Sequence, residues 1–329
     1  MAQAAGSLVA IAVLGVAGLL LARRDLLPPR AVDGLKLLIT RLTLPVLLFG
    51  AFVRLEPDGR NAALAAVVFG LCAVMGGLGA VATRLAGLPR PETRLLFQGF
   101  EAGMLGYALF VALHSSEHLP AFAALDMGQV VYVFTVLMVQ MSMLGRAAGS
   151  GTAGAAGAAG AETADAAGDG GRGRFPWRDL AASPVLWAIG VGLVIAVAAP
   201  GLAEQVTASD GVVAPFLATV GGLTTPLVCL VIGASLADGV PRDRAIVTIV
   251  ALRTLVGLGL GLVVALVLVP ALGFSDWYAR AAVVLFVLPA PFVIPVYYRR
   301  NAAFVGGVLT LSTAVSIGVI AVLAVVGIA

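Results

Sequence analysis

Residues 288–295 read LPAPFVIP and lie inside an apolar stretch long enough to cross a membrane. Each of the prolines at positions 289, 291 and 295 removes a backbone N–H donor, so a continuous helix cannot run through the stretch. Non-helical backbone at membrane depth is tolerated only where protein or a water-filled cavity surrounds it. This sequence therefore predicts a membrane helix that is broken in its middle.

Residues 98–107, which read QGFEAGMLGY, predict a second break. Gly99, Gly103 and Gly106 permit an unwound turn, because glycine adopts backbone conformations that other residues avoid. A Gly-xxx-Gly packing face between helices is the alternative interpretation. Broken helices expose N–H groups at the ends of half-helices, and such groups can bind an anion.

The composition of the whole chain agrees with a membrane protein. Of its 329 residues, 60% are hydrophobic and 11% are charged, and the mean hydropathy is +1.06. Soluble domains carry about 25% charged residues. The net charge of +3 comes without the basic clustering that nucleic-acid binding needs. Cys72 and Cys229 lie in apolar runs, so we expect neither a disulfide nor a cysteine metal site, and no cofactor.

We expect an all-α polytopic membrane protein with ten transmembrane helices, since about 20 residues of helix cross about 30 Å of hydrocarbon. The predicted spans run over 6–22, 35–53, 61–83, 95–113, 124–145, 183–200, 212–237, 245–270, 278–298 and 302–328.

Basic residues predict the orientation of these spans. Fifteen of the 20 lie in the odd-numbered loops, whereas only Arg54, Arg60 and Arg280 lie in the even-numbered loops. Cytoplasmic loops are enriched in Lys and Arg. The prediction is a multi-pass protein of the plasma membrane with both termini outside the cell.

A segment rich in glycine and alanine divides the chain. Residues 147–180 contain the run from 149 to 173, which reads GSGTAGAAGAAGAETADAAGDGGRG. Such a composition is typical of a flexible linker. We therefore divide the chain into a first five-helix repeat (1–146), a cytoplasmic linker (147–180) and a second five-helix repeat (181–329). A plain tether is the simplest role for the linker, and a regulatory role is left open.

The two halves share a short pattern. Residues 42–45 read LTLP and residues 223–226 read LTTP, and an apolar run leads from each to an Asp-Gly pair at 58–59 and 238–239. Coincidence in a biased composition is the alternative. If the repeat is genuine, an odd number of spans places the copies in opposite orientations, which is the construction of many secondary transporters.

Several of these pieces together resemble the auxin efflux carrier family of membrane transporters across nearly the whole chain. The matching pieces are RLTLPVLLF at 41–49, GMLG at 103–106, SP at 183–184, TPL at 225–227, IGASL at 232–236, LP at 288–289 and LSTAVS at 311–316. The resemblance implies two inverted five-helix repeats, with the fourth and ninth helices crossing at their broken centres. It also implies a small organic anion as substrate, such as malate or malonate in bacteria and auxin in plants. The family commonly has Asn where this chain has Glu101 and Pro where it has Ala108, which puts the substrate and the coupling ion in doubt.

Polar residues inside the predicted spans are the candidates for binding and coupling. Glu101 is the main candidate, because an intramembrane carboxylate is costly and is usually functional. We expect it to titrate, carrying a proton or gating anion entry, although a side chain that snorkels to the interface is the alternative. Arg253 is expected to pair with Glu101, to attract an anion, or to snorkel. The full set of substrate-binding or coupling candidates is Thr43, Pro45, Gln98, Glu101, Gly103, Gly106, Thr225, Pro226, Arg253, Pro289 and Pro291.

The resulting hypothesis is a secondary active transporter that moves a small organic acid by alternating access, coupled to a proton or to sodium. A sodium-coupled symporter or a cation/proton exchanger of similar fold is the main alternative. We do not expect an enzyme, because no cluster of His or Cys lies within the spans. No P-loop is present, so ATP drive is not encoded in the sequence. The expected partners are the substrate, the coupling ion and the lipid bilayer, without nucleic acid; a homodimer is left open.

Overall fold

The computed structural model describes residues 2–56, 58–88, 90–149, 183–208, 211–237, 239, 243–298 and 301–328. All regular secondary structure within these ranges is helical. Most of the predicted linker (147–180) lies outside the described residues.

Six helical stretches are long and apolar enough to cross a membrane. They are Pro29–Phe52, Gly59–Leu85, Ser116–Met141, Val213–Ser235, Arg244–Ala271 and Ala302–Val326. Each of them overlaps a predicted span. Large apolar side chains such as Val81, Leu266 and Val325 are exposed on the outer faces of these helices, as expected for surfaces that meet lipid. The architecture is therefore compatible with a multi-pass membrane protein.

The first half contains α1 to α8. Their bounds are α1 Ala2–Arg23, α2 Pro29–Leu38, α3 Leu44–Phe52, α4 Gly59–Leu85, α5 Pro91–Leu96, α6 Tyr107–His114, α7 Leu119–Tyr132 and α8 Met138–Gly149. Short π-helical turns η1 (Ile39–Thr43), η2 (Ala102–Gly106) and η4 (Val133–Leu137), and the 3-10 turn η3 (Ser116–His118), connect some of these helices.

The second half contains α10 to α18. Their bounds are α10 Pro184–Ala198, α11 Pro200–Thr207, α12 Val213–Gly222, α13 Thr224–Ser235, α14 Arg244–Val263, α15 Val269–Ala271, α16 Asp276–Val287, α17 Ile294–Tyr297 and α18 Ala302–Val326, with a π-helical turn η5 (Val264–Leu268).

The predicted span 183–200 is formed by α10, and the chain bends sharply at the end of this span. Helices α10 and α11 meet at a bend of 119°. The bend lies at Ala199, which has φ −142° and ψ 63°, directly before Pro200. A residue that precedes proline is disfavoured in the helical region, so the first helix ends there and a new one begins.

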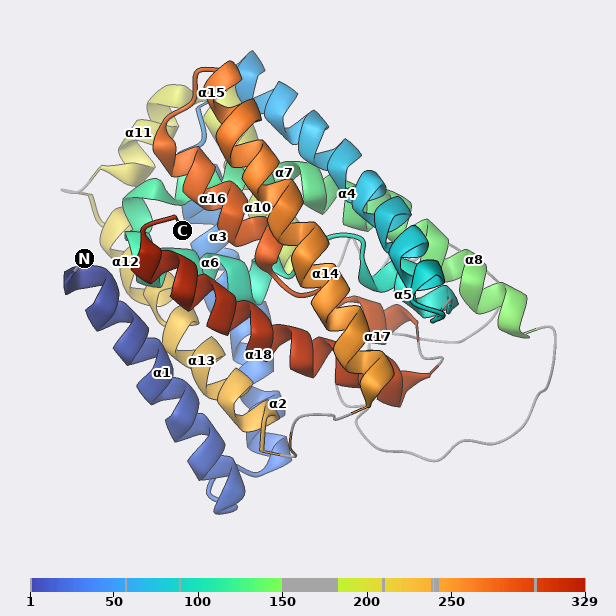
Figure 1. The fold of residues 1–329 in the computed structure, drawn as a ribbon. Coiled ribbons are helices and arrows are strands. Elements are labelled where there is room, and N and C mark those ends of the chain that lie inside the picture. The colour runs from blue at the N-terminus through green and yellow to red at the C-terminus, as the bar shows by residue number, and fades with distance from the viewer. Residues whose placement is uncertain are drawn as a thin grey trace.

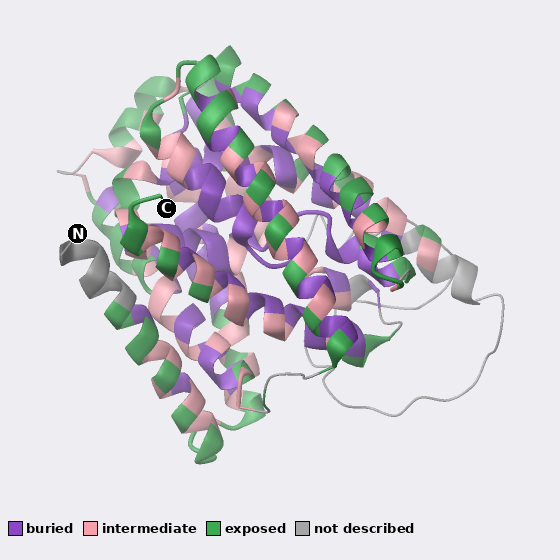
Figure 2. Cartoon of the chain, viewed as in Figure 1, coloured by how far each residue is buried: buried purple, intermediate pink, exposed green. Residues whose placement is uncertain are grey.

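Helices from opposite halves of the chain pack together at glycines (Figure 1). Helix α1 lies along α13, and Gly233 of α13 approaches the backbone of Gly15 so closely that a side chain would not fit. Helix α10 packs on α3. Within the halves, α4 packs on α7 and α14 packs on α18. Buried residues gather in the middle of the assembly, as Figure 2 shows.

Two segments in this middle are interrupted helices. Between α5 and η2 the chain is non-helical over 97–101, and between α16 and α17 it is non-helical over 288–293. The second break contains Pro289 and Pro291, as the sequence predicts. The first break contains only one of the three glycines expected there, Gly99, while Gly103 and Gly106 lie in the π-helical turn that follows.

Candidate functional site

The two interrupted segments meet at their breaks. The backbone N–H of Glu101 donates a hydrogen bond to the carbonyl oxygen of Pro289 at 2.9 Å. Gly99 has φ +70°, and a Cβ on it would lie 2.7 Å from Val133 Cγ2 and 3.0 Å from Pro291 Cγ. Glycine is therefore required here both by the backbone conformation and by the close approach of the second break.

The carboxylate of Glu101 accepts a hydrogen bond from each broken segment. Its Oε1 accepts from the N–H of Met104 at 3.1 Å, and its Oε2 accepts from the N–H of Phe292 at 2.6 Å. Met104 lies in η2 just after the first break, and Phe292 lies within the second break, two residues before α17. Neither N–H group follows a complete helical turn that could supply its partner. The side chain is 8% exposed. One buried carboxylate thus accepts a backbone hydrogen bond from each of the two interrupted segments.

Arg253, on α14, fills the complementary role. It is 2% exposed. Its guanidinium donates to the carbonyl oxygens of Leu96, Gly99 at 2.8 Å and Leu288 at 3.2 Å. These carbonyls lie at the ends of α5 and α16 or within the break, where a helix leaves its acceptors unpaired. Arg253 therefore binds the backbone acceptors freed by both breaks.

The signs of these two charges match the helix dipoles. Helix N-termini carry partial positive charge and C-termini carry partial negative charge, so Glu101 and Arg253 each lie at the favourable end. Among the described residues, the salt bridges are Lys36–Asp33 and Arg60–Asp58. The direct Glu101–Arg253 ion pair, one of the expected roles of Arg253, is not among them. Neither side chain snorkels to a surface.

Helix α7 supplies another buried acid. Asp126 is 1% exposed. It accepts hydrogen bonds from Tyr107 Oη at 3.0 Å and from Gln129 Nε2 at 2.8 Å. Gln129 Oε1 in turn accepts from the N–H of Phe100, next to Glu101, at 3.0 Å. Glu101 is therefore not the only buried acid in the predicted spans among the described residues. Asp126 lies near the start of the predicted span 124–145, and its polar partner at Gln129, three residues later on the same helical face, was the available signal.

Gln98 connects the first break to α7 and α8 through hydrogen bonds. Its Nε2 donates to the carbonyl of Arg94 at 2.9 Å and to Gln140 Oε1 at 3.0 Å, and its Oε1 accepts from Tyr132 Oη at 2.6 Å. Its amide is thus fully used by protein partners. Gln98 therefore links the first break to α7 and α8, and its expected role in binding or coupling stays a prediction.

The paired Thr-Pro segments border the same region. Thr43 and Thr224 are fully buried, and their hydroxyl oxygens have no hydrogen-bond partner among the described residues. Thr225 donates to the carbonyl of Ala108 on α6 at 3.2 Å. Pro45 and Pro226 lie within the continuous helical stretches Pro29–Phe52 and Val213–Ser235, where α3 follows η1 and α13 follows α12. Buried hydroxyls without a partner are uncommon and call for an explanation.

Gly103 and Gly106 differ although both lie in η2. A Cβ on Gly106 would lie 2.6 Å from Leu288 Cδ1 and 2.8 Å from Phe122 Cζ, so this glycine is needed for the second break to pack. A Cβ on Gly103 would lie no closer than 3.7 Å to Glu101 Oε1 or Leu44 Cδ2. Gly103 therefore lies beside the carboxylate and has room for a methyl group.

Contacts at both ends show how the interrupted segments run. At one end Glu92 of α5 accepts hydrogen bonds from Tyr298 Oη at 3.1 Å and Asn301 Nδ2 at 2.7 Å, just after α17. At the other end the ring of His118, in η3, stacks on Trp277 of α16 at 3.5 Å. Helix α5 thus meets the segment after α17, and the chain just beyond α6 meets α16. The two interrupted segments therefore contact each other at both ends.

The described residues contain no group of three or more His, Cys, Asp or Glu side chains arranged to hold a metal ion. No protein-family model matches the chain, and no curated protein matches it.

Proposed function

We propose that this protein is a secondary transporter that moves a small organic anion, malate-like, malonate-like or auxin-like, by alternating access. The observation that carries the proposal is the pair of N–H groups of Met104 and Phe292, which come from separate helix breaks and converge on one carboxylate. Backbone N–H groups at the starts of interrupted helices bind anions in membrane transporters. In this conformation the carboxylate that they bind is the protein's own Glu101.

A substrate carboxylate can take these N–H groups only after the Glu101 carboxylate has left them. Protonation of Glu101 favours this step, because a charged acceptor forms stronger hydrogen bonds than a neutral one. Arg253 stays bound to the backbone carbonyls and keeps a positive charge close by. The expected cycle therefore takes up one proton for each substrate carboxylate that displaces Glu101.

Access to this site requires movement. Glu101 is 8% exposed, so a substrate reaches it only when the surrounding helices separate on one side. Alternating access then opens the site to each side of the membrane in turn.

We further propose ten spans in two inverted five-helix repeats and kinship with the auxin efflux carriers. The packing supports the repeat, because exchanging the first five predicted spans with the last five turns the α1–α13 pair into the α10–α3 pair. The same exchange turns the α4–α7 pair into the α14–α18 pair. We also propose that the protein lies in the plasma membrane with both termini outside, an orientation that the distribution of arginines supports.

One observation favours the alternative of a sodium-coupled symporter or a cation/proton exchanger. Asp126 provides another buried carboxylate, and such proteins use intramembrane acids to carry ions. However, every carboxylate oxygen of Glu101 and Asp126 already accepts a hydrogen bond from a protein donor. A bound cation would have to displace these donors, so we prefer the organic anion.

The test is uptake of labelled malate, malonate and auxin into proteoliposomes that contain the purified protein. Imposed proton and sodium gradients are varied separately. We expect uptake of at least one carboxylate that rises with an inward proton gradient. Sodium/proton exchange without uptake of any carboxylate would contradict the proposal and support the alternative.

A further inference from the structure

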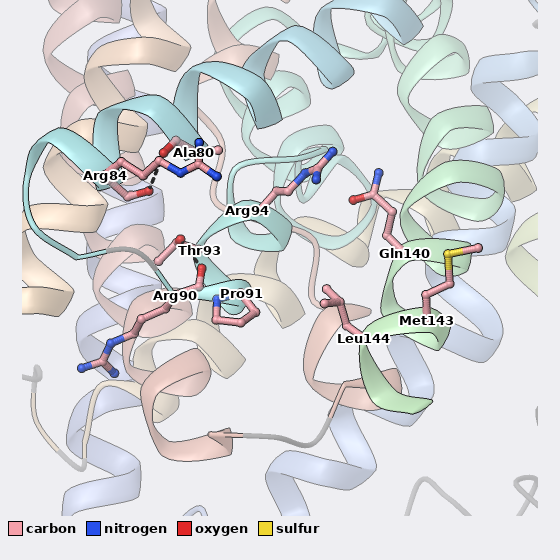
Figure 3. Close-up of a pocket in the computed structure, with 10 residues that line it drawn as sticks. Ala80, Arg84, Arg90, Pro91, Thr93, Arg94, Gln140, Met143 and Leu144 are labelled. Atoms are coloured by element: carbon pink, nitrogen blue, oxygen red, sulfur yellow. Dashed lines mark hydrogen bonds between the residues drawn. The ribbon is translucent and has the colours of Figure 1, made fainter. Parts of the chain in front are cut away.

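A cavity of about 500 Å³ lies where the ends of α4, α5 and α8 meet, away from Glu101. Its wall includes Arg84, Arg90, Arg94, Gln140, Met143 and Leu144 (Figure 3). Arg84 belongs to the last turn of α4 and Arg94 to the last turn of α5. Nothing in the proposed transport cycle uses this cavity.

The cavity has an excess of positive charge. Its wall holds three arginines and no acidic side chain. None of the three forms a salt bridge with any residue in the described part of the chain. Glu92, the acid nearest to them in sequence, is buried against Tyr298 and Asn301 instead.

The three arginines are directed differently. The guanidinium of Arg90 stacks over the ring of Phe304 at 4.6 Å, and in Figure 3 its side chain points away from the cavity. Arg94 is directed toward Gln140 in the same view. Arg84 and Arg94 therefore remain as two cations without a counter-charge among the described residues.

Part of the remaining wall is apolar and continues onto the surface that meets lipid. Met143 on α8 is 61% exposed, and Val81 and Leu85 on α4 are 54% and 85% exposed. Leu144 completes the apolar side of the cavity. An occupant that matches both parts of the wall carries an anionic group and a long apolar chain.

We propose that this cavity binds the phosphate headgroup of an anionic phospholipid, held by Arg84 and Arg94, with the acyl chains lying along α4 and α8. Basic pockets between membrane helices bind such headgroups, and arginine suits phosphate because its planar donors match the phosphate oxygens. Free phosphate or a soluble dicarboxylate shares the anionic chemistry but leaves the apolar wall uncovered.

The bound lipid acts on the first helix break through two hydrogen bonds. Gln98 donates to the carbonyl of Arg94 and to Gln140 Oε1, and both of these residues line the cavity. A headgroup that fixes Arg94 and Gln140 therefore also fixes α5 relative to α8. Lipid binding is expected to stabilise the folded protein, because it acts on the native state alone.

The experiment measures thermal unfolding of the purified full chain in a neutral detergent during titration with phosphatidylglycerol. Phosphatidylcholine with the same acyl chains, and glycerol 3-phosphate without any, serve as matched probes. The variants are R84Q/R94Q, the charge-conserving R84K/R94K, and R23Q/R24Q at the exposed end of α1 as the control for general electrostatic attraction.

We expect phosphatidylglycerol to raise the unfolding temperature of the unmodified protein and of the R23Q/R24Q variant to the same extent. The R84Q/R94Q variant should bind it about 30-fold more weakly, since each arginine near the membrane surface contributes about 1 kcal/mol. R84K/R94K should recover most of the affinity, which separates loss of charge from misfolding. Equal effects of the two phospholipids, full retention of the effect in R84Q/R94Q, or saturation by glycerol 3-phosphate alone would each overturn the proposal.

Discussion

Glu101 and Arg253 bind opposite sides of the same two helix breaks. Glu101 accepts from the N–H groups of Met104 and Phe292, and Arg253 donates to the carbonyls of Leu96, Gly99 and Leu288. Between them, one negative and one positive side chain pair five backbone groups that unbroken helices would have paired themselves. Interrupted backbone inside a membrane protein requires such partners, and here each partner also carries a charge of the sign that the helix dipoles favour.

Replacing Arg253 tests the carbonyl side of this arrangement. R253M keeps the approximate shape of the side chain but leaves three carbonyls without donors. We expect a loss of about 3 kcal/mol or more in the free energy of unfolding, because removing one partner leaves buried groups unpaired. Denaturant unfolding in detergent measures this loss in the free energy of unfolding. The exposed Arg244 on the same helix is the control, and R244M should be close to neutral; equal effects of the two variants would refute this role for Arg253.

Gly103 and Gly106 of η2 provide a matched pair of positions that tests how closely the two helix breaks pack together. G106A forces a methyl group against Leu288 and Phe122, and overpacking of this kind costs about 1 to 3 kcal/mol. G103A meets no atom closer than 3.7 Å and gains helix propensity, so its stability should be unchanged or slightly higher. Thermal unfolding of both variants measures these two effects on stability. If G103A lowered the stability and G106A did not, the two helix breaks would not pack against each other at Gly106 as described.

We expect the unpartnered hydroxyls of Thr43 and Thr224 to form hydrogen bonds with the substrate. Valine has nearly the same shape without the hydroxyl, so T43V and T224V should raise stability by up to about 1 kcal/mol, because a buried unpaired polar group is removed. Uptake assays should show weaker apparent affinity for the carboxylate substrate in both variants. T225V, which loses a hydrogen bond to Ala108, should instead lower stability. Unchanged substrate affinity in T43V and T224V would exclude a contact with substrate.

Asp126 is expected to support the site without carrying the coupling proton. D126N retains an acceptor for only one of its two donors, so stability should fall by about 1 to 3 kcal/mol. Transport should become slower while keeping its dependence on the proton gradient. The exposed Asp276 provides the control D276N. Loss of proton dependence in D126N, with normal dependence in the E101Q variant, would transfer the coupling role from Glu101 to Asp126.

Single cysteines test the proposed orientation. Cys72 and Cys229 are buried, so labelling by a membrane-impermeant reagent should report on introduced residues. We expect H118C to react from outside intact cells and G157C, in the linker, to react only after the membrane is opened. The reverse pattern would invert the topology.

The fold was predictable where local chemistry decides it. The prolines at 289 and 291 break the second segment as expected, and long apolar runs form six of the predicted spans as helices. The bend between α10 and α11 also has a local cause, Pro200, whose position at the end of a predicted span concealed it.

The contacts of the site were less predictable, because its partners are far apart in sequence. Arg253 binds the carbonyl of Leu96, 157 positions away, and Phe292 reaches Glu101 across 191 positions. Sequence identified Glu101 and Arg253 as costly charges but could not indicate that backbone groups, and not each other, are their partners. Asp126 was missed for the same reason, since its burial depends on Tyr107 from another helix.

The role of Glu101 is tested most directly by the pH dependence of carboxylate uptake into proteoliposomes that contain the E101Q variant. The control is E117Q, which changes an exposed acid in η3. Glutamine is neutral at every pH, so it cannot release the N–H groups of Met104 and Phe292 by taking up a proton. We expect E117Q to retain uptake stimulated by an inward proton gradient, and we expect any uptake by E101Q to be independent of that gradient. Proton-stimulated uptake in E101Q equal to that of the unmodified protein would contradict this role of Glu101.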